Sequence, residues 1–315
     1  MNTLNISKFM RRLFLANFIC ICLFTHFFAS GAEIKMAYSD LVPSALQKFL
    51  YNDSVLSDDG LDSGIINLSA YQSGSLPMIE DFLSERLDIC ILALPEGGEF
   101  PVLDNDNITK IPFGYKSSVV VVNAENPISE ITIGQLSSMF GDTSTVGNLM
   151  SWRDFGMSSF SSSFIKSYSV KEDFGISSDL FRYTVLNEKP FSPSVTLESY
   201  DNVQRLILQD KAAIGVFPNK PENPNLKVLF VAQDNESIAY GPSIDNVYYA
   251  DYPIRLPFYI VYNSTDTKQL FPLINSLLSE NVADIISESD FFPVPKVIRE
   301  KLIIDLQLYL QENGN

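Results

Sequence analysis

The chain has 315 residues, with 22 basic and 38 acidic side chains and a formal net charge of −16. A surface this acidic repels nucleic acid and anionic lipid, so we expect neither as a partner. The length suits one large domain or two lobes of moderate size.

The chain begins with the pattern of a secretory signal. Basic residues Lys8, Arg11 and Arg12 precede the apolar run "LFLANFICICLF", and the small residues Ser30 and Ala32 follow it. A retained membrane anchor is the alternative, but the apolar run is short for one. We therefore predict that residues 1–32 are a signal peptide cleaved near Ala32 and that the protein is periplasmic or secreted. Cleavage removes three basic and no acidic residues, so the net charge becomes −19.

Two kinds of segment alternate along the rest of the chain. Apolar runs rich in Val, Ile, Leu and Tyr predict strands at 64–71, 87–95, 117–124, 226–232 and 256–263. Helical spacing predicts helices at 43–50, 76–86, 132–140, 176–186, 199–210, 267–286 and 295–312. This alternation predicts an α/β fold with mostly parallel sheets.

Histidine and cysteine are scarce in the mature chain. The one histidine, His26, and two of the three cysteines, Cys20 and Cys22, lie in the signal segment. The remaining Cys90 sits in an apolar run, where we interpret it as a core residue. Ser-His and Cys-His catalysis and His-ligated metal sites are thereby excluded. We interpret paired carboxylates as solvated surface charge, so we expect no enzyme, no metal and no cofactor.

Four longer stretches resemble the periplasmic phosphate-binding proteins of ABC importers. They begin at Tyr71 ("YQSGSLPMIEDFLSERLDICILALPEG"), Ile111 ("IPFGYKSSVVVVNAENPISEITIGQLSSMFGD"), Asp210 ("DKAAIGVFP") and Tyr252 ("YPIRLPFYIVYN"). Their order along the chain matches that family. The resemblance implies a two-lobed type 2 periplasmic-binding-protein fold, with a mostly parallel sheet flanked by helices in each lobe and a ligand cleft between the lobes. Lobe 1 would comprise residues 33–115 plus 254–315, and lobe 2 residues 116–253.

The resemblance also suggests where an oxyanion would bind, because the family uses helix starts, hydroxyls, one arginine and one aspartate. The corresponding positions of this chain are Ser39, Ser73, Gly74, Ser75, Lys171, Gly175, Ser177 and Arg255. In "VKEDFGISSDLF", Lys171 replaces the arginine of the family's third loop, and an ammonium lacks the bidentate fork of a guanidinium. Each of these helix starts is also explained by ordinary capping, and that alternative stays open.

The fourth ligand loop departs furthest from the family. Its Ser-Asp pair is replaced by apolar residues of the run 92–95 ("LALP"), so the aspartate is missing. Glu96 and Glu99 follow directly, and we interpret both as solvated loop charges. Arg255 stands one position before the arginine of the family's return segment.

These observations predict a monomeric extracytoplasmic solute-binding protein that delivers phosphate, or a related small oxyanion, to the membrane subunits of an ABC importer. The alternative is a secreted scaffold or interaction protein that keeps the fold but has lost phosphate binding. The altered ligand loops keep that alternative open.

Overall fold

The structure, a computed structural model, describes residues 33–51, 68–98, 100–141, 150–156, 164–171 and 176–313. The predicted signal segment and Gly175 lie outside these ranges. Within them, no helix combines the length and the apolarity that crossing a membrane requires.

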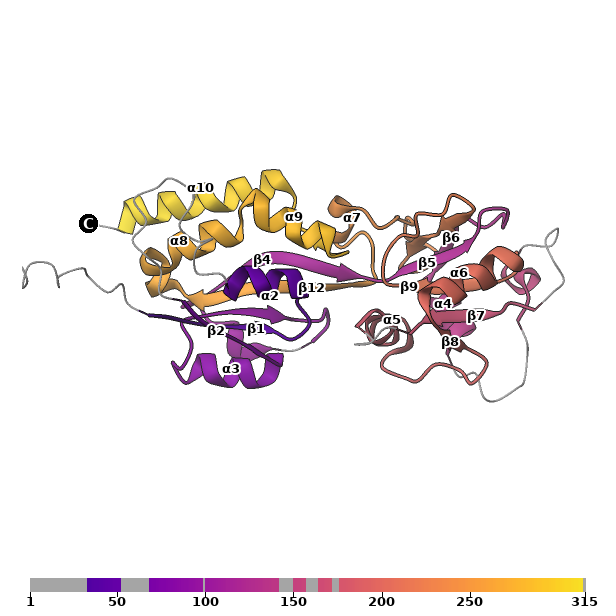
Figure 1. Ribbon diagram of the computed structural model, residues 1–315, viewed down its shortest axis with the longest axis horizontal. Coiled ribbons are helices and arrows are strands. Elements are labelled where there is room, and N and C mark those ends of the chain that lie inside the picture. The colour runs from indigo at the N-terminus through magenta and orange to yellow at the C-terminus, as the bar shows by residue number, and fades with distance from the viewer. Residues whose placement is uncertain are drawn as a thin grey trace, which may run out of the picture.

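The described strands form two main sheets, and each sheet is the centre of one lobe (Figure 1). The sheet of lobe 1 has the strand order β13 (Phe292–Pro293), β4 (Ile108–Ser117), β12 (Arg255–Asn263), β3 (Ile89–Ala93), β1 (Ile34–Ser39) and β2 (Leu68–Ser73). Strand β1 is parallel to β2 and β3, whereas β12 is antiparallel to β3 and β4.

Helices cover both faces of the sheet in lobe 1 (Figure 1). They are α2 (Ser44–Tyr51), α3 (Ser75–Leu83), α8 (Thr267–Leu277), α9 (Glu280–Glu288) and α10 (Lys296–Asn313). Because side chains alternate along a strand, Cys90 of β3 packs with α3 on one face, and Ile91 joins the larger core on the other. Cys90 is fully buried, and burial raises the pKa of its thiol, which fits the predicted core role.

The sheet of lobe 2 also mixes parallel and antiparallel pairs. Its order is β10 (Leu226–Val228), β5 (Val119–Asn123), β9 (Ile214–Phe217), β7 (Ser167–Val170) and β8 (Thr196–Glu198). The prediction of mostly parallel sheets is therefore wrong for both lobes, because the long strands β4 and β12 and the strand β5 pair antiparallel with their neighbours. A separate pair joins β6 (Glu130–Thr132) to β11 (Phe230–Ala232), and the helices are α4 (Ile133–Phe140), α5 (Ile176–Leu186), α6 (Tyr200–Gln209) and α7 (Ile244–Tyr248). Short 3-10 turns occur at Pro101–Leu103, Trp152–Phe155 and Ser264–Asp266.

The chain passes between the two sheets at Ser118, which separates β4 from β5, and returns where β12 begins. Buried hydrogen bonds join the two crossings: the Ser117 hydroxyl donates to the Ile254 carbonyl at 2.8 Å, and the Tyr252 hydroxyl donates to the Ser118 carbonyl at 2.8 Å. Burial raises the pKa of Tyr252, so this phenol keeps the proton that it donates. The lobe boundaries at 116 and 254 stay predictions.

Two predicted segments are divided in the structure. The predicted strand 226–232 breaks at Leu229, whose N–H donates to the Val120 carbonyl, while the Phe230 N–H donates to Ser129. Its two halves therefore belong to different sheets. The predicted helix 267–286 ends at Leu277, and the Ser279 side chain caps a new helix by accepting from the Val282 N–H.

Candidate functional site

One end of the sheet in lobe 1 brings together most of the predicted binding residues. The parallel strands β1 and β2 end side by side, with Ser39 paired to Ser73. Strand β12 begins at the same end, because Phe258 pairs with Ala93 at the end of β3, and Arg255 pairs with Ser117 beside the crossing to lobe 2. This end of the sheet therefore faces the second lobe.

The predicted hydroxyl groups at this end already make local hydrogen bonds. The buried Ser39 hydroxyl accepts from the Leu41 N–H at 3.2 Å, as in an ordinary turn. The Ser75 hydroxyl donates to the Ala93 carbonyl at 3.0 Å and so ties the start of α3 to the end of β3. Gly74 is the N-cap of α3 and supplies no capping side chain. The Ser75 contact thus fixes the start of α3 against the end of β3, and the Ser39 contact shapes the turn after β1.

Two cations are buried at this end: Lys116, whose ammonium donates to the carbonyls of Pro218 and Asp290, and Arg255, whose side chain is only 9% exposed. Its Nη1 donates to the Val247 carbonyl and, at 2.8 Å, to the Tyr248 carbonyl. Its Nη2 donates to the Glu96 carboxylate, and its Nε has no hydrogen-bond partner among the described residues. The guanidinium also lies over the ring of Tyr115, 5.1 Å from the centroid.

A polar cavity of about 500 Å³ opens beside Arg255. Its lining comes from both lobes and from the returning chain: Glu96, Gly97, Tyr183, Thr184, Asn187, Glu188, Gln233, Ala250, Pro253 and Arg255. The Tyr183 hydroxyl on α5 donates to the Glu96 carbonyl at 3.2 Å and so joins lobe 2 to the loop after β3. We call this space the interlobe cavity. A larger cavity, of about 620 Å³, lies at β10, β11 and α7 and contains none of the predicted binding residues.

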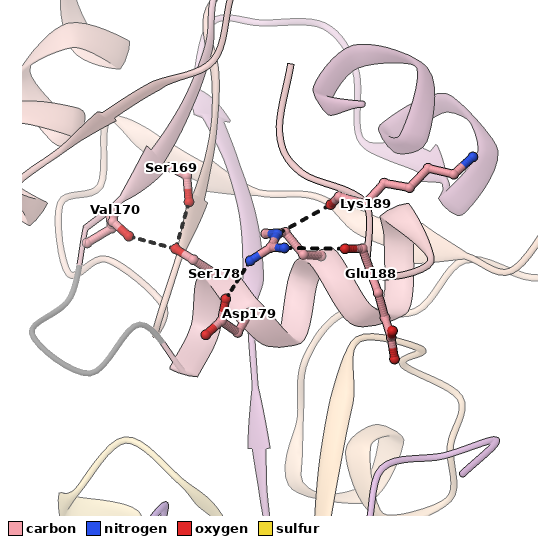
Figure 2. Close-up of polar contacts among 7 residues, drawn as sticks. Ser169, Val170, Ser178, Asp179, Glu188 and Lys189 are labelled. Atoms are coloured by element: carbon pink, nitrogen blue, oxygen red, sulfur yellow. Dashed lines mark hydrogen bonds and ion pairs between the residues drawn. The ribbon is translucent and has the colours of Figure 1, made fainter. Parts of the chain in front are cut away.

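The predicted third loop lies at the start of α5, and Figure 2 shows its surroundings. Lys171 is exposed and lines a different cavity, of about 470 Å³, together with Arg182 and Phe191. The Ser178 hydroxyl lies 3.0 Å from the Ser169 hydroxyl and donates to the Val170 carbonyl at 3.0 Å (Figure 2). These bonds fasten the first turn of α5 to the end of β7.

Ser177, in the first turn of α5, lies closer to the crossing between the lobes. It is buried, and its carbonyl accepts a hydrogen bond from the Ser118 hydroxyl at 2.7 Å. The structure therefore places Ser177 beside the hinge and Lys171 on the surface. No group of three or more His, Cys, Asp or Glu side chains is arranged to hold a metal ion within the part of the chain that the structure describes.

Comparisons with known proteins give matches in sequence and in fold. Protein SphX of Synechococcus elongatus is 27% identical over 240 residues, which cover 73% of this chain and 70% of SphX. The phosphate-binding protein PstS of Pseudomonas aeruginosa is 22% identical over 212 residues, which are 64% of this chain and 64% of that protein, slightly under two thirds. No family model matches the chain.

Two solved structures share the fold over most of their length. PstS from Borrelia burgdorferi matches with a TM-score of 0.66 and 17% identity, over 84% of this chain and 99% of that chain. A possible phosphate-binding protein from Planctomyces limnophilus matches with a TM-score of 0.63 and 19% identity, over 88% of this chain and 98% of that chain. The chain is thus similar in sequence to SphX and PstS and similar in fold to the two solved structures. The predicted resemblance and the predicted two-lobed α/β fold are confirmed.

The likeness to phosphate-binding proteins did not predict the partner of Arg255. Glu96 was interpreted as a solvated loop charge, yet its carboxylate pairs with a guanidinium 159 positions away. No local pattern around Glu96 signals this contact, since the two residues meet only through the antiparallel pairing of β3 with β12. Tyr183 was likewise not singled out, because in the sequence it reads as an ordinary residue of an amphipathic helix.

Proposed function

We propose that this protein is an extracytoplasmic solute-binding protein that takes up phosphate, or a related small oxyanion, and delivers it to the membrane subunits of an ABC importer. It is not an enzyme, and it acts as a monomer in the periplasm or outside the cell after cleavage near Ala32. The similarity to phosphate-binding proteins supports this function over a scaffold that has lost its ligand.

The observation that carries the proposal is the buried Arg255 guanidinium beside a polar cavity that both lobes line. A guanidinium is the side chain best suited to grip two oxygens of an oxyanion. Hydroxyls and backbone N–H groups near Ser39, Ser73 and Ser75 would supply further donors at the same end of the sheet. Lys171, Gly175 and Ser177 would approach from the second lobe.

Capture would proceed by closure of lobe 2 onto lobe 1 about the two crossing segments. Lobe 1, residues 33–115 plus 254–315, would carry Arg255 and the strand ends, and lobe 2, residues 116–253, would carry α5. The bonds among Ser117, Ser118 and Tyr252 keep the crossings together, so bending would be concentrated there.

Isothermal titration of the ligand-stripped mature protein with phosphate and then sulfate, at neutral pH, tests the function. We expect phosphate to bind with a micromolar or tighter Kd. A folded protein that gives no heat with either anion would contradict the proposal and would favour the scaffold alternative.

A further inference from the structure

We propose that Arg255 supplies the main positive charge of the oxyanion site and that Glu96 is a built-in competitor, whose carboxylate binds the same guanidinium as the oxyanion. The inference rests on the proposed function and specifies how that site is charged and regulated. It assigns Lys171, the cation expected from the sequence, a lesser role.

The hydrogen bonds of Arg255 leave one edge of the guanidinium suited to an anion. Nη1 is committed to the carbonyls of Val247 and Tyr248, so the group is fixed in position. The opposite edge consists of Nε and Nη2, which together form a two-donor fork. Glu96 uses Nη2 alone, and Nε is buried without a partner among the described residues. A tetrahedral oxyanion has the second oxygen that would fill the fork.

The interlobe cavity can admit such a ligand. Its volume of about 500 Å³ far exceeds the roughly 30 Å³ that one water occupies, so an oxyanion and bridging waters fit. Hydroxyl and amide groups of Tyr183, Thr184, Asn187 and Gln233 line it. The side chains of Thr184, Asn187 and Gln233 can donate hydrogen bonds to the oxygens that face away from Arg255, whereas the Tyr183 proton is already used by the Glu96 carbonyl.

The charges that line the interlobe cavity mean that the oxyanion and the Glu96 carboxylate compete for Arg255. Glu96 and Glu188 both line it, against the single guanidinium of Arg255. An oxyanion added while Glu96 remains bonded would face two carboxylates and one cation, which is unfavourable in a partly desolvated space. The carboxylate of Glu96 must therefore leave Arg255 before the oxyanion takes its place.

The carboxylate of Glu96 can leave Arg255 at a low cost in free energy. Its side chain is 44% exposed, so the displaced carboxylate can be solvated without moving the backbone. Its own carbonyl stays bonded to Tyr183, and Gly97 follows with a φ of 77°, a conformation that glycine adopts readily. The apparent affinity for the ligand is then the intrinsic affinity multiplied by the fraction of molecules in which Glu96 is not bonded to Arg255.

Lys171 fits the role of main cation less well. It is exposed, it lines a cavity that shares no residue with the interlobe cavity, and its ammonium is a point charge. Water screens such a charge far more than it screens the buried Arg255.

The test is isothermal titration of the Glu96→Gln protein with phosphate and with sulfate. Removal of the competing charge should tighten the binding of both anions by about tenfold, since a hydrogen bond to a charged group must no longer be broken. Glu280→Gln is the matched control, because Glu280 also pairs with a buried arginine, Arg299, but does not line the interlobe cavity, and we expect a change of less than about threefold. Thermal melting verifies that each variant is folded, and Glu96→Ala, which also removes the carboxylate, replaces Glu96→Gln if the latter is not.

The outcomes separate the inference from the function. Equal affinity of wild type and Glu96→Gln would overturn the inference alone. Weaker phosphate binding with unchanged or tighter sulfate binding would also overturn it, because Glu96 would then accept a proton from the ligand. Measurable binding by wild type and about tenfold tighter binding of both anions by Glu96→Gln would support it. No binding by any folded variant would remove the proposed function, and the inference with it.

Discussion

Two arginines on either side of the lobe crossing show how differently the same side chain can be used. Arg255 is buried, takes its partners from three separate parts of the chain and keeps its Nε without one among the described residues. Arg182 on α5 is one-third exposed and bonds to its own helix and the turn after it. Its Nη1 donates to Asp179 at 2.9 Å, and its other donors reach the carbonyls of Glu188 and Lys189 at 3.3 Å (Figure 2).

The difference teaches that a cation suited to a ligand is buried and keeps a donor that the protein does not use. Arg182 uses all three of its nitrogens, on the Asp179 carboxylate and on two carbonyls of the turn that follows α5. Arg255 also satisfies carbonyls, but with one edge of the guanidinium only. On the other edge, Nη2 holds the half-exposed carboxylate of Glu96, which lines the interlobe cavity and which, in our proposal, the oxyanion replaces.

Replacing Arg255 should have the largest effect of the changes that we consider. Arg255→Lys keeps the charge but removes the fork, so we expect oxyanion affinity to fall by about 100-fold, or about 2.7 kcal/mol, by titration calorimetry. Arg299→Lys is a close control. Arg299 is also buried and bonds to two carbonyls, of Val294 and Leu278, and to one glutamate, Glu280, yet it does not line the cavity.

Both variants lose comparable hydrogen bonds, so both should be destabilised, and only the Arg255 variant should lose affinity. Equal loss of affinity in the two proteins would mean that Arg255 acts through stability alone.

The next effect is on stability rather than on binding. Arg182→Ala removes three hydrogen bonds at the end of α5 and should lower the free energy of unfolding by about 1 kcal/mol, measured by urea denaturation. Oxyanion affinity should stay within about twofold of wild type. Lys189→Ala is the control, because the Lys189 ammonium points away from this cluster (Figure 2). A large loss of affinity in Arg182→Ala would show that α5 carries more of the site than Arg255 does.

The sequence placed Ser39 and Ser73 ahead of two predicted helices, because helix starts have local signals, and the structure pairs the two serines directly. It did not predict the strand that Ser39 ends, and the predicted strand 64–71 stops two residues before Ser73. The contact between Glu96 and Arg255 could not be predicted, since it depends on how β12 aligns with β3. The same limit explains the predicted strand 226–232: the run is apolar throughout, and only hydrogen bonds to Val120 and Ser129 show that it serves two sheets.

Lys171 stands where phosphate-binding proteins have a binding arginine, so replacing it shows how much its charge contributes to oxyanion binding. Lys171→Ala should lower oxyanion affinity by about threefold at low salt without unfolding the protein. The effect is small because water and salt screen the charge of an exposed side chain. The effect should shrink as ionic strength rises. Lys268→Ala, on α8 of lobe 1, removes the same charge from an exposed position outside the interlobe cavity and should change nothing measurable. A loss of 100-fold in Lys171→Ala would restore Lys171 as the main cation and displace Arg255.

The smallest effect should come from the contact that joins the lobes at the cavity. Tyr183→Phe removes one hydrogen bond to the Glu96 carbonyl from a half-exposed side chain, worth about 0.5 kcal/mol. The loop after β3 would then be less restrained, and amide hydrogen exchange at Glu96 and Gly97 should be faster. Affinity should change by no more than about twofold, because the Arg255 fork is untouched. Tyr200→Phe, on α6, is the control. Unchanged exchange in Tyr183→Phe would mean that the Glu96 backbone is held by its own turn, and that its carboxylate leaves Arg255 without help from the second lobe.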